Sequence, residues 1–393
     1  MLTINKEQCT GCGACVQRCP QNCISWQTAE FGFFYPVIDE KKCVDCGLCE
    51  RVCPIDKDIS HLNFQKFFAA VHNNKQILSK STSGGAFSAI AEKVIEKKGV
   101  VYGVIMNDDA RVHHIRVDNN YELIKMRGSK YVQSRTVNTY KQAEEDLKKG
   151  ITVLYTGTPC QIFGLKKFLG KEYSNLYTID IVCHGVGSQE YFDKYMEFAR
   201  ERYGEIREIQ FRSKEFSGWS CGSGCIVSRY RGSQSDEARI PYNDYENYYY
   251  SYFLLGDIYR NACYLCKYAN TNRVGDFTLG DFWGVESLKL PLNTSGGCSL
   301  IIVNNQRAMK FLEEIDTLDM LETTIEQATK FNNQLKSPSS LHSSREKRLL
   351  EFETMDGKSI QKEYIKSHLG RFFKGYIKSR IPYRLKLFIR SKR

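Results

Sequence analysis

Eight of the sixteen cysteines in this 393-residue chain fall in two runs with the same spacing. Residues 9–20 and 43–54 each read Cys-x2-Cys-x2-Cys-x3-Cys-Pro, so the second run repeats the first 34 residues later. Three closely spaced thiolates can wrap one corner of a cubane iron–sulfur cluster, and the fourth, a helical turn away, reaches a second cluster. We therefore expect two [4Fe-4S] clusters, the first held by Cys9, Cys12, Cys15 and Cys53, and the second by Cys43, Cys46, Cys49 and Cys19.

This spacing is that of bacterial ferredoxins, and it argues against the simpler alternative of zinc. Zinc sites use Cys-x2-Cys pairs, but here both runs are complete and both end in proline. Gly11, Gly13 and Gly47 stand beside the expected ligands, where a missing side chain lets the backbone approach inorganic sulfide closely. Cys23 lies outside the repeat, and we interpret it as a small buried side chain rather than a ligand.

Four later cysteines form a less regular set: Cys160, Cys183, Cys263 and Cys266. Cys160 falls at the expected start of a helix and Cys183 at the end of an expected strand. In a parallel α/β sheet the carboxyl ends of strands and the starts of the following helices meet in one crevice, where cofactors bind. A third cubane would form if all four thiols converge there. The alternatives are a zinc site or a redox dithiol at Cys263 and Cys266, with the other two as isolated core cysteines.

A short glycine loop, Ser83-Gly84-Gly85, precedes an expected helix. Its free backbone N–H groups could cradle a phosphate, although a tight turn is the simpler interpretation. Lys130, in a Gly-Ser-Lys-Tyr segment, adds a cation but is uninformative alone.

Taken in order, several motifs resemble the coenzyme F420 hydrogenase/dehydrogenase β-subunit family. The resemblance covers roughly residues 66–305, behind the ferredoxin unit. The matching motifs are Ser83-Gly-Gly85, Gly128-Ser-Lys-Tyr131, Thr158-Pro-Cys-Gln161, Cys183-His-Gly-Val186, Phe211-Arg-Ser-Lys214, Cys263-Tyr-Leu-Cys266-Lys267, Arg273-Val-Gly-Asp276 and Leu279-Gly-Asp-Phe-Trp283.

Members of this family resemble iron–sulfur flavoproteins that bind FAD. The resemblance implies that the later cysteine set holds a third [4Fe-4S] cluster. It also implies flavin contacts at Ser83, Gly84, Gly85, Lys130 and Thr158. It identifies no deazaflavin pocket and no catalytic residue, and the last 80 residues fall outside it.

Between these motifs, expected strands and helices alternate, which predicts an α/β core. Strands are expected over residues 67–71, 100–105, 151–155 and 176–182, and helices over 86–97, 161–169 and 188–202. Residues 206–231 have a more β-rich pattern. The predicted fold is an α+β ferredoxin-like domain (residues 1–60), an α/β flavin-binding domain with a smaller β-rich insertion (66–310), and a helical C-terminal region with a basic amphipathic tail (311–393).

These features predict an iron–sulfur flavoprotein oxidoreductase. Electrons would pass between the clusters and FAD, and the flavin would exchange hydride with an unidentified organic substrate. The expected partners are a one-electron donor such as ferredoxin and a small organic, deazaflavin or flavin-type acceptor. Two other classes stay open: a non-catalytic electron-transfer subunit that feeds a partner enzyme, and a structural iron–sulfur protein without flavin.

Positive charge is concentrated at the C-terminus. Residues 361–393 carry eleven Lys and Arg against one Glu, which accounts for +10 of the net charge of +11. The net positive charge of the chain therefore belongs to this tail, and residues 1–360 lack the excess of basic residues typical of a nucleic-acid-binding protein. In this tail apolar residues recur at helical spacing between cations, a pattern typical of a helix lying in an anionic membrane interface. The alternatives are a helix docked on the protein's own core and a docking site for an acidic ferredoxin.

The sequence also predicts where the protein resides. No run of about 18 apolar residues is present to span a bilayer, and the first residues lack a signal-peptide pattern. Clustered cysteines of this kind suit a reducing compartment. We expect a cytoplasmic protein, with peripheral contact at the inner face of the membrane as one reading of the tail.

Overall fold

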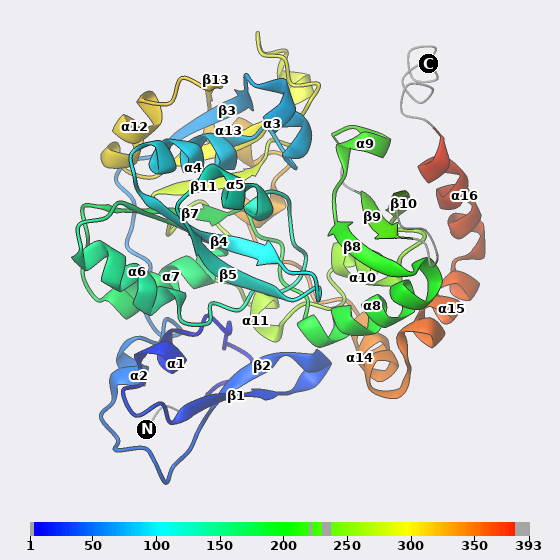
Figure 1. Cartoon of the computed structure of the whole chain (residues 1–393), viewed down its shortest axis with the longest axis horizontal. Helices are drawn as coiled ribbons and strands as arrows, with labels where there is room; N and C mark the ends of the chain where they lie inside the picture. Colours follow the sequence, from blue (N-terminus) through cyan, green and yellow to red (C-terminus); the bar gives the residue numbers. More distant parts are fainter. Residues whose placement is uncertain (1–3, 220–221, 230–236, 382–393) are drawn as a thin grey trace.

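The computed structural model describes residues 4–219, 222–229 and 237–381. Figure 1 shows three parts: a small N-terminal unit, a large sheet flanked by helices, and a second lobe formed by the β-rich insertion and the C-terminal helices.

The N-terminal unit contains two short helices and a two-stranded sheet. Helix α1 (Ala14–Arg18) ends just before Cys19, and α2 (Leu48–Arg51) ends shortly before Cys53. A glycine in the left-handed conformation precedes each helix, Gly13 and Gly47 respectively. Strands β1 (Ile24–Thr28) and β2 (Phe34–Ile38) pair antiparallel between the two runs.

Eight strands form one mixed sheet in the order β13-β3-β12-β11-β7-β6-β4-β5 (Figure 1). Its parallel centre places four carboxyl ends at one edge. These strands are β4 (Val100–Met106), β6 (Val153–Gly157), β7 (Leu176–Ile181) and β11 (Phe277–Asp281). Antiparallel strands complete both sides: β5 (Val112–Val117), β12 (Ser299–Val303), β3 (Lys66–His72) and β13 (Leu318–Thr323). The predicted mixed α/β class is confirmed.

Helices pack against this sheet, mainly α4 (Ala86–Glu96), α6 (Thr139–Lys148), α7 (Pro159–Leu169) and α12 (Gln306–Glu313). Side chains cap two of them, α7 and α12. Helix α7 starts at a reciprocal capping box between Thr158 and Gln161, with proline at its first position, where no N–H partner is needed. Gly170 ends it in the left-handed conformation. The capping box therefore fixes the start of the helix that carries Cys160.

The sheet extends beyond residue 310, the limit expected from the sequence. Strand β13 pairs with β3 along its whole length, so part of the predicted C-terminal region belongs to the central sheet. Strand β13 is six residues long, partly exposed, and lies at the edge of the sheet.

The second lobe contains the predicted β-rich insertion as a three-stranded antiparallel sheet, β8 (Glu205–Gln210), β9 (Ser223–Arg229) and β10 (Glu237–Asn243). Around it lie α8 (Gln189–Tyr203), α10 (Tyr248–Leu255), α14 (Ser344–Thr354), α15 (Gly357–Ser367) and α16 (Leu369–Arg380) (Figure 1). Buried aromatic rings fill the space between these elements, among them Tyr191, Phe192, Tyr248 and Tyr249. The C-terminal helices therefore complete the core of the insertion.

Helix α16 is docked on one side only. It meets β10 at Gly375, where a side chain would overlap Tyr245. Large apolar side chains elsewhere on the helix are exposed, by 53% at Leu369, 57% at Phe373 and 63% at Ile377. The tail predicted to contact a membrane continues into residues 382–393, which lie outside the described residues. No helix in the described ranges is both long and apolar enough to cross a membrane.

Candidate metal centres

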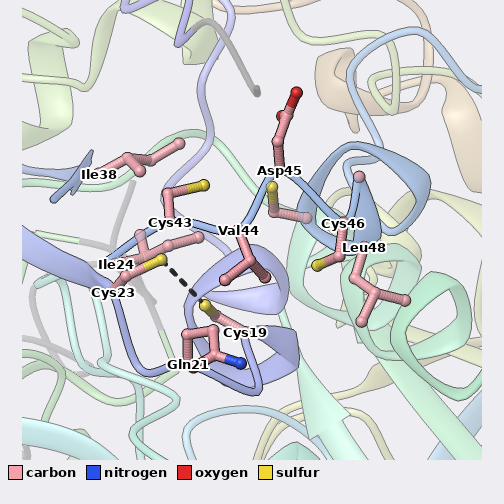
Figure 2. Close-up of a pocket in the computed structure, with 12 residues that line it drawn as sticks. Cys19, Gln21, Cys23, Ile24, Ile38, Cys43, Val44, Asp45, Cys46 and Leu48 are labelled. Carbon is pink, nitrogen blue, oxygen red and sulfur yellow. Dashed lines mark hydrogen bonds between the residues drawn. The ribbon is translucent and has the colours of Figure 1, made fainter. Parts of the chain in front are cut away.

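Five cysteines line one cavity of the N-terminal unit (Figure 2). Four are the thiols predicted for the second cluster, because Cys19 from the end of α1 meets Cys43, Cys46 and Cys49 of the second run. The fifth is Cys23, whose Sγ lies 3.3 Å from the Sγ of Cys19. Cys23 is buried, as expected, but it lies among the predicted ligands rather than apart from them.

The four thiols predicted for the first cluster also converge. Burial is the main cause that raises the pKa of Cys12 to about 12 and that of Cys15 well above its usual range. The neighbouring thiols of Cys9 and Cys53 add to both shifts. Deprotonating four crowded, buried thiols costs free energy unless a cation compensates for the charge. Iron in a cluster supplies that compensation, so the donor set fits the expected cofactor.

The later cysteine set lines a cavity of about 210 Å³. Cys160 is the second residue of α7, Cys183 follows β7, and Cys263 lies in the short helix α11 (Asn261–Tyr264) with Cys266 just after it. Burial raises the pKa of the Cys183 thiol well above its usual range, and the other three thiols add to the rise. The structure thus brings all four residues together at the carboxyl edge of the parallel strands.

This geometry bears on the alternatives for the later set. A redox dithiol reacts through a thiolate of lowered pKa. Burial instead raises the pKa of Cys263 to about 12, and it also raises the pKa of Cys266. Convergence likewise disfavours isolated core cysteines. Among the described residues, no three His, Cys, Asp or Glu side chains are close enough together to bind one metal ion. A cubane does not need such a group, because each of its four thiolates binds a different iron.

The first and third sets are neighbours. A side chain on Gly164 of α7 would come within 2.9 Å of the Cys12 Sγ, so this helix packs directly on the first set. The same helix carries Cys160, which is close enough to raise the pKa of Cys12. Tyr268 is close to both sets. Burial is the main cause that raises the pKa of its hydroxyl, and thiols of both sets, Cys160 and Cys12 among them, raise it further.

Two cations beside Cys263 and Cys266 hold the N-terminal unit against the sheet domain. Arg260, only 1% exposed, donates to the Cys9 carbonyl at 2.6 Å and to the Phe34 carbonyl at 3.0 Å. Lys267 donates to three carbonyls in the loop after Cys53, those of residues 54, 55 and 57, at 2.6–2.8 Å. Sequence reasoning missed both roles. The available signal was a basic residue on each side of the Cys-x2-Cys pair.

The predicted flavin contacts lie in two places. Ser129 N–H donates to the Thr82 Oγ1 at 3.1 Å, which joins the Ser83–Gly85 loop to the segment of Lys130. Thr158 instead lines the cavity of the third set, with its Oγ1 3.1 Å from the Cys160 Sγ.

The glycine loop has packing reasons of its own. Ser83 donates its hydroxyl to the Cys298 carbonyl at 2.8 Å. A side chain on Gly84 would overlap the backbone of β3 and β12. Gly85 has φ 91° and begins α4, and a side chain there would come within 2.8 Å of His72. Close backbone packing explains Gly84 and the left-handed conformation explains Gly85, and a phosphate role stays a prediction.

One cation, Lys214, contacts this loop, and Lys130 and Arg212 belong to segments beside it. Lys130 donates to the carbonyls of residues 125–127 at 2.9–3.2 Å, and burial lowers its pKa to about 7. Lys214, which sequence reasoning did not single out, donates to the Ser83 carbonyl at 2.6 Å, and burial lowers its pKa to about 8. Arg212 pairs with Asp281 but leaves its buried Nε and Nη2 without a partner among the described residues. Both missed residues lie in the Phe-Arg-Ser-Lys motif quoted above.

Comparison with known families agrees with these features. The coenzyme F420 hydrogenase/dehydrogenase β-subunit family matches through its N-terminal model over residues 67–141 and its C-terminal model over residues 151–328. A 4Fe-4S dicluster domain model matches residues 8–57. The protein is thus an iron–sulfur electron-transfer protein related to oxidoreductases. It belongs to the coenzyme F420 hydrogenase/dehydrogenase β-subunit family, with a dicluster domain in front.

Among solved structures, the chain is similar to one from the F420-reducing [NiFe] hydrogenase complex of Methanosarcina barkeri, determined as a xenon derivative. The identity is 14%, the match covers 79% of this chain and 91% of that chain, and the TM-score is 0.44. No curated protein matches the chain.

Replacing Arg260 by Ala should lower the free energy of unfolding by about 3 kcal/mol, because buried carbonyls of the N-terminal unit lose their donor. Chemical unfolding of the anaerobic protein measures the change. The control is Arg111→Ala, which removes a half-exposed arginine paired with Asp193 and should cost below about 1 kcal/mol. An equal loss of unfolding free energy in the two variants would contradict the role of Arg260 as the clamp that holds the N-terminal unit against the sheet domain.

Proposed function

We propose that this protein is an iron–sulfur flavoprotein oxidoreductase in which three [4Fe-4S] clusters exchange electrons with FAD. The observation that carries the proposal is the cavity of about 210 Å³ lined by Cys160, Cys183, Cys263 and Cys266, adjoining the thiols of the first set. When bound, the clusters supply one-electron steps and the flavin supplies the hydride step toward an organic substrate.

The residues around the third set suit a cluster that must accept and release charge. A cubane held by four thiolates carries a net charge of about −2 in its oxidised form. Arg260 faces this cavity, and Lys267 contributes to its wall. Both cations favour the negatively charged cluster.

The cations around the Ser83–Gly85 loop suit the diphosphate of FAD. The amino end of α4 adjoins this loop, and the helix dipole stabilises anions there, while the N–H groups of Gly84 and Ala86 donate to the Ser299 Oγ. Lys130 and Lys214 add positive charge, and the unpartnered Nε and Nη2 of Arg212 are hydrogen-bond donors in need of an acceptor. Thr158, at the third set, would lie on the side of the flavin that faces the cluster.

The second set is where we place electron entry. Cys46 is the exposed member of that set, whereas Cys9, Cys12 and Cys15 are buried. A one-electron donor such as ferredoxin would dock there, and the route would then run through the first and third sets to the flavin. The acceptor is a small organic molecule or a deazaflavin or flavin-type compound.

The second candidate is a non-catalytic subunit that passes electrons to a partner enzyme. The similar solved chain comes from a hydrogenase complex, which agrees with such an arrangement. Reduction of an artificial hydride acceptor by the purified chain distinguishes the two, because an electron-transfer subunit has no turnover alone.

The third cluster can be tested in the full chain with Cys263→Ala. The wild type should hold about twelve iron atoms and the variant about eight, since one four-iron cluster is lost. Flavin content should not change. The control is Cys225→Ala, which removes a buried thiol of β9 outside the three sets and should leave twelve. About eight iron atoms in the wild type would contradict a third cluster.

FAD affinity should depend on pH through Lys130. A bound phosphate stabilises the protonated amine, so affinity is highest below the pKa of about 7 in the free protein and falls as pH rises through it. Lys130→Arg keeps the charge, so the fall should move toward the pKa of about 8 of Lys214. Equilibrium titration of the flavin-free protein measures both profiles. If the FAD affinity of the wild type does not change from about pH 6 to 9, Lys130 is not part of the flavin site.

We also propose that α16 rests on an anionic lipid surface. Its exposed apolar residues, Leu369, Phe373 and Ile377, recur every four residues, and the exposed cations Arg371 and Lys374 lie between them. Apolar residues at this spacing form one stripe along a helix, and basic neighbours are attracted by anionic headgroups. This combination favours a membrane over docking on the protein's own core, since these side chains are not covered.

In a co-sedimentation assay the protein should pellet with anionic vesicles at low salt, and neither with neutral vesicles nor at about 0.5 M salt. Phe373→Glu with Ile377→Glu should weaken binding at least tenfold, because two apolar side chains no longer enter the interface. The control pair Leu341→Glu and Leu350→Glu alters equally exposed residues elsewhere and should bind normally. Equal binding of both pairs would contradict the proposal.

A further inference from the structure

The cavity of the second set holds one thiol more than a cubane can use. Cys23, at the residue before β1, lines it together with Cys19 and the first three cysteines of the second run (Figure 2). The Sγ atoms of Cys19 and Cys23 are 3.3 Å apart, within hydrogen-bonding distance for sulfur. Either thiol therefore occupies nearly the same corner of the cavity.

The internal repeat shows that this arrangement is specific to one set. Moving 34 residues along the chain takes Cys19 to Cys53 and Cys23 to Lys57. Lys57 is exposed, and its carbonyl accepts a hydrogen bond from Lys267. The first set accordingly has no equivalent of the extra thiol, and the two halves of the repeat provide an internal comparison.

We propose that Cys23 is a reserve ligand of the second cluster. While Cys19 binds iron, Cys23 remains a thiol and donates its S–H to the Cys19 sulfur. If the Cys19 thiolate is lost, Cys23 releases its proton to the buffer and its thiolate forms the Fe–S bond at the vacated iron. One thiolate replaces another, so the iron oxidation state and the cluster charge stay the same.

The position of the second set gives this reserve a use. Cys46 is exposed, so solvent and oxidants reach this set more readily than the buried first set. Oxidation of an accessible cluster thiolate beyond the sulfenic state is irreversible. Cys19 is itself only 6% exposed, so the reserve thiol serves this corner once an oxidant has passed the exposed Cys46 and entered the cavity.

The test compares equivalent positions of the repeat in the full chain. Cys53→Ala should lose about four iron atoms and four sulfides, whereas Cys19→Ala should keep the wild-type content. The double variant Cys19→Ala with Cys23→Ala should then lose about four iron atoms and four sulfides. Iron and sulfide analysis of anaerobic protein, with EPR of the reduced clusters, measures the result. Loss of four irons from Cys19→Ala alone overturns the proposal.

Cys23→Ala alone gives a second measurement if Cys19→Ala does not fold. Hydrogen bonds to ligand sulfurs set cluster potentials, and a donor favours the reduced, more negative state. The variant should keep its iron, and the midpoint potential of the second cluster should fall in an EPR-monitored titration. An unchanged potential overturns the proposal in that case. Neither measurement depends on FAD or on the third cluster, so failure of the proposed function would be seen separately.

Discussion

A buried positive charge, the guanidinium of Arg260, joins the two parts of the molecule on which electron transfer depends. A cation removed from water is tolerated only where acceptors surround it. The carbonyls of Cys9 and Phe34, the side-chain oxygen of Gln133 and the ring of Tyr35, 4.1 Å away, provide those acceptors. Most of them belong to the N-terminal unit, while Arg260 belongs to the sheet domain. The dicluster unit is consequently held in one position over the third set.

The close contact between the first and third sets follows from small residues and capping at α7. Gly164 lets the Cys12 thiol approach this helix, and the capping box at Thr158 sets where the helix starts and so where Cys160 lies. The parallel strands then bring Cys183 to the same edge. A short separation between the first and third sets of thiols thus results from ordinary helix and sheet geometry.

The sequence allowed the cluster ligands to be predicted because their spacing is local and repeated. Topology placed Cys160 and Cys183 at one edge of the sheet, since strand ends and helix starts meet there, but only the family resemblance implied that Cys263 and Cys266 join them. Arg260 and Lys214 could not be predicted in the same way, because their partners lie far away in the chain. The pairing of β13 with β3 and the packing of α14–α16 on the insertion are also tertiary outcomes. Cys23 was separated from the ligands because the linear pattern does not show that β1 returns it to Cys19.

The clamp between Arg260 and Cys9 also bears on how the protein is made. These residues are 251 positions apart, so the contact forms only after most of the chain has left the ribosome. Contacts of such long range are slow to form, because much chain entropy is lost before they are made. Until then the thiols near the N-terminus lie on a nascent chain and are not yet buried against the sheet domain. Iron and sulfide therefore have to reach these cysteines while the rest of the chain is still being made and folded. Growth conditions that slow translation would lengthen the period in which oxygen can reach them.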